Sequence, residues 1–548
     1  LQSEYNYLRN MNKIKKIMRT RLMILAAALM IACIAKGQEN NDRPNGEFPG
    51  GPVGNFQVGQ GGFPGGPGGF PGGFPGGPGG PGGFPFMMDV DFDAIKEYGV
   101  EIDKRKLDEG NEQIVTDKRD STSVYFVENE TFEHKVTIRF DGNVVNVEGL
   151  PSGVKSETVG ADLKLTVKGM KICYELSGKS EDGSVHIKSD RPTKLILNGL
   201  DLKSESGEAI SVTGKESVYL VLSPGSTNRL EDKFRDVEER SSFGVPSPFQ
   251  RRDDLAEEDL EEVGGVKMKK ALNRSKKLSE SKVSGVLTSS GLLSLSGDGE
   301  LTVVGHNKSG LKSKGHMIFR PGIVTNIEVS QGKGLSSKGD IRIYGGVVNI
   351  DGSSSGEDGI RSECSIYISG GRTTVLASGG EGSEGIEGKY NIIVNGGVVE
   401  VASFDDGLNA GGNLIVNGGK VFVASVFNDA LDSNCNLVIN GGEVTAFGGG
   451  VPECGLDANE EEGYELYING GHVVSVGGRS TPTSVQSRQQ SLIYSCESID
   501  SGSVYGVYDN ELELMRVKIV RKYDREGSFL FSCPEMKKGI NNLHVEKL

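Results

Sequence analysis

A period of about 24 residues runs through the second half of the chain and limits the folds that it can adopt. A Gly-Gly pair between two short alternating apolar segments recurs at Gly345-Gly346, Gly370-Gly371, Gly396-Gly397, Gly418-Gly419, Gly441-Gly442 and Gly470-Gly471. The steps between these pairs are 25, 26, 22, 23 and 29 residues. Gly, and to a lesser degree Asn, tolerates left-handed backbone, so each pair is predicted to form a tight corner between two strands.

A second motif, Gly-(Ile/Leu)-x-(Ser/Ala/Gly), keeps the same period and stays in phase with the first. Its copies begin at Gly310, Gly334, Gly359, Gly385, Gly407, Ala430 and Gly455. Each unit then holds three short strands, of which 408–410, 413–416 and 398–401 are typical. Three strands and three corners predict one coil of a parallel β-helix. Successive coils must stack, because one unit cannot bury its own apolar face.

The predicted fold class is therefore all-β, a solenoid with β caps at both ends. A leucine-rich-repeat horseshoe is the alternative, but the units lack its leucine spacing and its helix, and a propeller blade needs about 40 residues. We predict the β-helix over residues 186–478, with caps at 113–185 and 479–548. A densely charged stretch at about 226–283 is predicted to be a solvated insertion in an early coil.

The segments before the repeat predict export. Residues 1–37 comprise upstream residues and a signal peptide, whose apolar run from Leu22 to Ile34 is too short to span a bilayer. Cys33 lies in a loose lipobox, which leaves a lipid anchor as an alternative. Residues 38–112 are rich in Gly, Pro and Phe and predict a disordered linker. We expect no transmembrane segment, and an extracellular, cell-surface or periplasmic location.

Composition excludes several classes of function. The chain has 60 basic and 75 acidic residues, a net charge of −15, which argues against a nucleic-acid partner. It has no Trp, so a sugar site built on a broad tryptophan platform is excluded. The six cysteines beyond Cys33 form no Cys-x-x-Cys pair and give no support for a zinc or redox site. An exported chain permits a disulfide, but the sequence cannot assign the pair.

Acidic and amide side chains recur around the start of the second motif in successive units. The predicted ligands are Glu384, Glu387, Asp406, Asn409, Asp429, Asp432, Asn434, Asp457 and Asn459. Equivalent positions in adjacent coils lie about 4.8 Å apart, where like charges repel by ~3.5 kcal/mol at an effective dielectric of ~20. Such a ladder is costly unless a cation lies within it, and hard oxygen ligands favour Ca²⁺. A solvated acidic surface is the alternative.

The earlier units differ at these corners, because they carry lysines. The lysines at similar positions are Lys308, Lys312, Lys314, Lys333 and Lys338, and Arg361 follows in the next unit. One face of the coils is therefore expected to run from basic to acidic.

Three strings give a resemblance to a known family: residues 383–388 (SEGIEG), 405–410 (DDGLNA) and 454–459 (CGLDAN). With two further strings at 174–178 and 195–199, residues 130–478 outside the insertion resemble exported bacterial carbohydrate-binding domain-containing proteins, which are similar in fold to pectate lyases. The resemblance implies a right-handed parallel β-helix that binds plant-type polysaccharide and calcium. It implies that the family's acidic corner positions are similar to Asp406, Asn409, Asp429, Asp432 and Asp457.

The chain departs from the family pattern at three places. Ala430 replaces the motif glycine, Lys389 interrupts the acidic ladder, and Cys454 stands where an acid is usual. These departures place the coil of Lys389 outside the regular acidic pattern.

Three functions follow from these observations. Our prediction is an exported calcium-binding protein that recognises plant-type or uronate-containing polysaccharide without catalysis. The sequence does not identify the residues that contact the sugar. The first alternative is a calcium-dependent polysaccharide lyase, which needs a basic side chain to abstract a proton, with Arg361 and then Lys389 as candidates. The second is a structural surface adhesin held away from the cell by the linker.

Overall fold

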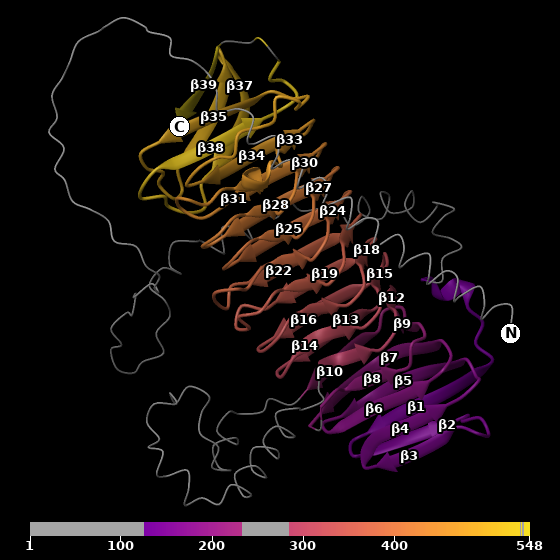
Figure 1. Ribbon diagram of the computed structural model, residues 1–548. Helices are drawn as coiled ribbons and strands as arrows, with labels where there is room; N and C mark the ends of the chain where they lie inside the picture. Colours follow the sequence, from indigo (N-terminus) through magenta and orange to yellow (C-terminus); the bar gives the residue numbers. More distant parts are fainter. Residues whose placement is uncertain (1–124, 206, 233–283, 538, 540–541) are drawn as a thin grey trace, which may run out of the picture. The chain divides into compact units, whose positions relative to one another are not determined.

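The computed structural model describes residues 125–205, 207–232, 284–537, 539 and 542–548 (Figure 1). The predicted signal peptide, Cys33, the linker and most of the charged insertion lie outside these residues. Among the described residues, no helix is long and apolar enough to cross a membrane. Helical structure there consists of two short 3₁₀ turns, η2 (Val127–Asn129) and η4 (Glu460–Glu462).

The first of three columns of stacked strands is a 12-stranded sheet (Figure 1). Apart from β3, which is antiparallel to β4, its strands pair in parallel. They are β3 (Lys155–Val159), β4 (Ala161–Val167), β6 (Gly183–Ser189), β8 (Ile210–Thr213), β11 (Gly285–Ser289), β14 (Ser309–Ser313), β17 (Leu335–Ser337), β20 (Ile360–Ser362), β23 (Ile386–Gly388), β26 (Leu408–Ala410), β29 (Leu431–Ser433) and β32 (Leu456–Ala458).

The second and third columns are also parallel, and each coil contributes one strand to each. The second column comprises β9 (Val218–Leu222), β12 (Leu293–Gly297), β15 (Met317–Phe319), β18 (Ile341–Ile343), β21 (Ile366–Ile368), β24 (Ile392–Val394), β27 (Leu414–Val416), β30 (Leu437–Ile439) and β33 (Leu466–Ile468). The third comprises β10 (Thr227–Asp232), β13 (Glu300–Gly305), β16 (Val324–Val329), β19 (Val347–Asp351), β22 (Arg372–Ala377), β25 (Val398–Ser403), β28 (Lys420–Ser425), β31 (Glu443–Phe447) and β34 (His472–Gly477). The predicted all-β parallel solenoid is confirmed.

The core lies inside the coils because successive residues of a strand point to opposite faces. In β26, Leu408 and Ala410 are fully buried and Asn409 between them faces outward. Leu408 pairs directly with Leu431 of the next coil, so apolar residues stack on apolar residues. A shift of one residue would turn the core residues outward, which is why the register is strongly specified.

The Gly-Gly corners form as the sequence predicts. The second glycine of each pair is left-handed, as at Gly419, where φ is 92°. A Cβ there would lie 2.6 Å from the Gly397 carbonyl oxygen of the preceding coil, so a larger residue does not fit. Beside these corners, Asn417 donates to Asn395 and Asn440 donates to Asn417, each at 2.8 Å. The asparagine ladder ties neighbouring coils together.

The parallel stacking begins within the segment predicted as the N-terminal cap. There β1 (His134–Asp141) pairs in parallel with β5 (Ile172–Ser180), and antiparallel with β2 (Val144–Glu148). The long strand β7 (Thr193–Ser204) then pairs with β5, β9 and β10. The predicted start of the insertion needs correction, because residues 227–232 form β10. Its residues Asn228 and Leu230 are buried, and β10 pairs with β13.

The described part of the last 70 residues forms five strands: β35 (Ser491–Cys496), β36 (Val504–Asp509), β37 (Leu512–Lys518), β38 (Gly527–Ser532) and β39 (Leu543–Lys547). β38 pairs antiparallel with β34, the last strand of the third column, and with β35. β37, β36 and β39 form a separate antiparallel sheet. The six described cysteines are free thiols.

Candidate metal centre

The middle residues of the first-column strands form one outward row along the coils. Direct pairing places in this row Lys312, Ser336, Arg361, Glu387, Asn409, Asp432 and Asp457. The row therefore runs from basic to acidic along the stack. The corner before each strand adds a second set of carboxylates: Asp358, Glu384, Asp406 and Asp429.

Three carboxylates converge at the acidic end of this row. Oxygens of Asp429, Asp432 and Asp457 all lie within 4.8 Å of one another, and we call these three residues the acidic cluster. Asp406 lies beside it and is buried, with one oxygen accepting from the Asp429 backbone N–H at 3.0 Å and the other from Asn409 Nδ2 at 2.9 Å. Asp429 in turn accepts from the backbone N–H of Cys454. Asp406 and Asp429 thus each accept a hydrogen bond from the backbone of the next coil, and each keeps further lone pairs that could bind a cation.

Burial and mutual repulsion raise the pKa values of these carboxyl groups. Burial, and then the nearby Asp432, Asp429 and Asp405, raise the pKa of Asp406 to about 9. Burial is also the main cause that raises the pKa of Asp429 to about 8 and that of Asp432 to about 7, with Asp457 adding to both. Without a cation, the ionised forms of these groups are therefore unfavourable.

The described residues supply little positive charge to the acidic cluster. Arg479 lies near Asp457, with Nη2 3.5 Å from Oδ1, and the Thr481 hydroxyl donates to the same oxygen at 3.0 Å. No described basic side chain forms an ion pair with Asp406, Asp429 or Asp432. A convergent set of carboxylate oxygens with so little compensation is the donor chemistry that suits a hard divalent cation.

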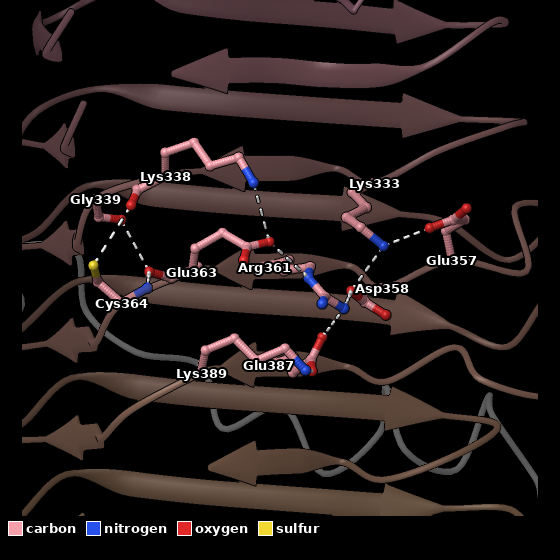
Figure 2. A network of polar contacts seen from close by, with 11 residues as sticks. Lys333, Lys338, Gly339, Glu357, Asp358, Arg361, Glu363, Cys364, Glu387 and Lys389 are labelled. Atoms are coloured by element: carbon pink, nitrogen blue, oxygen red, sulfur yellow. Dashed lines mark hydrogen bonds and ion pairs between the residues drawn. The ribbon is translucent and has the colours of Figure 1, made fainter. Parts of the chain in front are cut away.

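A second group of three carboxylates, a few coils earlier, is balanced by the protein itself. Figure 2 shows two of them, Asp358 and Glu387, with their basic partners. Oxygens of Asp358, Glu384 and Glu387 also lie within 4.8 Å of one another. Arg361 Nη1 lies 3.2 Å from Asp358 and contacts Glu387 as well. We call these four residues the Arg361 cluster. Arg361 thus occupies the position in the row that Asp432 and Asp457 take in the later coils.

Two lysines complete the compensation around the Arg361 cluster. Lys333 Nζ lies 2.9 Å from Asp358 and also contacts Glu357, while Lys389 contacts Glu387 (Figure 2). Burial and the neighbouring Asp358 raise the pKa of Glu384 to about 8, so Glu384 keeps a proton at neutral pH. Burial alone would raise the pKa of Asp358, but hydrogen bonds with Glu384, Lys333 and Arg361 lower it below its ordinary value. Internal cations and one retained proton therefore stabilise this group.

The structure thus divides the nine predicted ligands. Asp429, Asp432 and Asp457 come together, with Asp406 and Asn409 beside them, whereas Glu384 and Glu387 belong to the Arg361 cluster.

Asn434 and Asn459 bind backbone groups. Asn434 Nδ2 donates to the Ala410 carbonyl at 3.2 Å, and Asn459 Oδ1 accepts from the Glu462 N–H at 3.2 Å, where it caps η4.

Sequence reasoning missed the partners that decide the charge balance. Lys333 lies one repeat before Asp358, so the 25-residue offset was a signal that could have paired them. Arg479 and Thr481 follow the last repeat, where the period no longer predicts which residues lie next to Asp457.

Comparison with known proteins places these coils in a family. Residues 159–245 and 267–450 match a family model described as "Carbohydrate-binding domain-containing protein". Among solved structures, the chain is similar to a polysaccharide lyase-like protein from C. thermocellum, a gadolinium derivative. That similarity has 15% identity and a TM-score of 0.29, and covers 61% of this chain and 93% of that chain. No curated protein matches. The family match spans the stack from β4 to β31, and the chain belongs to the family of carbohydrate-binding domain-containing proteins.

Proposed function

We propose that this chain is an exported, non-catalytic polysaccharide-binding protein in which the acidic cluster binds Ca²⁺. The observation that supports the calcium site best is the convergence of Asp429, Asp432 and Asp457, with Asp406 buried beside them. In the part of the chain that the structure describes, one arginine lies next to this convergence. Family membership supports the carbohydrate partner. Export rests on the sequence pattern of residues 1–37, with a lipid anchor at Cys33 as its alternative form.

The two clusters together support a cation at the acidic cluster. Where the outward row holds Arg361, its guanidinium lies among the carboxylates. Where the row holds Asp432 and Asp457, Arg479 is the one described basic residue at the edge of a similar convergence. Ca²⁺ takes six to eight oxygen ligands, more than one corner offers, so the ligands would come from several coils. Asp429, Asp432 and Asp457 would hold the ion, and Asp406 and Asn409 are next in reach.

Calcium would supply two things here: compensation for buried carboxylates, and a positive centre for oxygen atoms of a glycan. Uronate carboxylates suit the second role because Ca²⁺ prefers hard, charged oxygen ligands. A polysaccharide that contains uronic acid is therefore the proposed ligand class.

The lyase alternative needs a basic side chain that can lose its proton. Arg361 contacts Asp358 and Glu387, whose charges outweigh burial and raise its pKa further. Lys389 contacts Glu387. Both predicted bases are engaged as counter-ions, which supports binding without catalysis. No described feature favours the adhesin alternative.

The test is retention of the full chain by polygalacturonate, in excess Ca²⁺ and in chelator, with ultraviolet absorbance recorded for unsaturated products. We expect retention in calcium, weaker retention in chelator, and no absorbance change. A rise in absorbance would establish a lyase instead. The absence of retention by polygalacturonate and by a neutral glucan such as cellulose would contradict the binding proposal.

A further inference from the structure

Two phenylalanines form an exposed stack at the corner between the third and first columns. Phe404 follows β25 and Phe427 follows β28, so they occupy the same corner of adjacent coils. Their ring centroids are 5.7 Å apart and the ring planes differ by 5°. The Phe427 side chain is 65% exposed, although a ring of this size normally gains stability by burial.

The corners on both sides of this pair begin with small residues. The preceding coil has Ser378, Gly379 and Gly380 there, and the following coil has Gly448, Gly449 and Gly450. A Cβ placed on Gly450 would meet nothing within 4 Å, so there is open space at this corner. Phe404 packs partly against the apolar cluster of the C-terminal strands. Phe404 is therefore held in place by packing, whereas Phe427 remains exposed to solvent.

The stack shares its corner with the candidate metal centre. Asp406 follows Phe404 by two residues, and Asp429 follows Phe427 by two residues. Between them, Asn428 Nδ2 donates to Asp405 Oδ1 at 2.9 Å, which links the two coils. An apolar ring face and a set of oxygen ligands are thus held side by side on one short stretch of backbone.

A pyranose ring has the complementary chemistry. Its axial C–H groups make one face apolar, whereas hydroxyl and carboxylate groups project from its edge. Carbohydrate sites accordingly combine an aromatic surface with a few fixed polar groups. The next corner also exposes Val451, at 54%. A second copy of this chain or an apolar peptide would need a larger apolar patch than these two side chains beside carboxylates.

We propose that Phe427, supported from below by Phe404, is the stacking platform for one pyranose ring of the bound polysaccharide. The polar edge of that ring lies toward the corner of Asp405, Asn428 and Asp429. The inference rests on the proposed function, since it names the surface that contacts the sugar. It also extends the sequence reasoning, which excluded a tryptophan platform and left the sugar-contacting residues unidentified.

The experiment compares the wild type with Phe427→Ala, Phe427→Tyr and a matched control, Leu512→Ala. Leu512 is 66% exposed and lies on β37 of the separate C-terminal sheet. Affinity for polygalacturonate and retention on cellulose are measured in excess Ca²⁺. Thermal unfolding, calorimetric Ca²⁺ affinity and mass in solution are measured on the same samples.

Phe427→Ala is expected to weaken glycan binding about tenfold, as loss of a central aromatic contact commonly does. Phe427→Tyr keeps the ring and should bind within about twofold of the wild type, as should Leu512→Ala. Calcium affinity and unfolding temperature should not change in any variant, because the Phe427 ring is exposed. This pattern would support the platform.

Two results would overturn the platform. One is wild-type glycan affinity in Phe427→Ala. The other is a change of mass in solution with unchanged glycan affinity, which would assign the ring to contact between copies. Failure of the wild type itself to bind either glycan would be different, because it would contradict the proposed function as a whole.

Discussion

The Arg361 cluster and the acidic cluster occupy equivalent corners of the same solenoid, but they are balanced in different ways. In the first, Arg361, Lys333 and Lys389 contact the carboxylates, and Glu384 keeps a proton. In the second, Arg479 is the one basic side chain among the described residues that approaches, at 3.5 Å from Asp457. The repeat places carboxylates at a regular spacing. We propose that one residue in the outward row then decides whether the protein or an external ion supplies the positive charge.

The largest expected effect comes from removing the internal cation. Arg361→Ala leaves Asp358 and Glu387, both buried, with less compensation. Breaking a buried ion pair by deleting one partner costs about 3–5 kcal/mol, and we expect the lower end because Lys333 and Lys389 remain. Denaturant unfolding measures the loss. The control is Arg516→Ala, whose ion pair with Glu513 is exposed and should contribute little to stability. Equal losses in the two variants would show that the Arg361 cluster is an ordinary surface network.

The next effect concerns the external cation. One Ca²⁺ at about 100 times its dissociation constant stabilises the folded state by ~2.7 kcal/mol. Chelation should therefore lower the unfolding temperature of the wild type. Equal unfolding temperatures in excess calcium and in chelator would contradict a calcium site in the acidic cluster.

A third effect sharpens the comparison between the clusters. Asp429→Ala and Asp432→Ala remove carboxylates that converge in the acidic cluster, so each should weaken calcium binding about tenfold. Asp358→Ala is the matched control, because Asp358 contacts Lys333 and Arg361 instead. Calorimetric titration compares the three affinities. If all three variants bind calcium equally, the acidic cluster is a solvated surface.

The smallest effect is a pH dependence in the Arg361 cluster. The pKa of Glu384 is about 8 in the folded chain, above the ordinary value of 4.5. The protonated form of Glu384 therefore contributes to the stability of the folded state. This contribution is fully present below about pH 4.5 and is lost as the pH rises through about 8. Glu384→Gln cannot ionise, so between pH 5 and 8.5 the wild type should lose more stability than this variant, by about 1 kcal/mol after solvent screening. Denaturant unfolding in chelator measures the difference, and parallel pH profiles would show that Glu384 ionises freely.

The fold and the row of site residues could be predicted because two motifs keep one period. The predicted strand 408–410 is β26, and Arg361, Glu387, Asn409, Asp432 and Asp457 do stack in register. In a three-residue strand with apolar ends, only the middle residue can face outward. Spacing was therefore enough to place these side chains.

Spacing was not enough to assign their partners. An amide at a corner can ligate an ion or bind backbone, and Asn459 caps η4. Arg479 and Thr481 reach Asp457 from beyond the last repeat. The stack of Phe404 on Phe427 depends on the direction in which side chains point at a corner. The spacing of the repeat does not specify that direction. The residues that determine the chemistry are those that break the repeat.

The most direct measurement exchanges the charge at one position of the row. Asp432→Arg places an arginine in the acidic cluster at the position that Arg361 occupies in the other. Calcium is titrated calorimetrically into the wild type and this variant, and unfolding temperatures are recorded with and without chelator. We predict that the wild type binds calcium and that chelator lowers its unfolding temperature. The variant should not bind calcium, and chelator should not change its unfolding temperature, which should be at least as high as that of the wild type in chelator. Equal calcium binding by both proteins, or none by the wild type, would contradict the account.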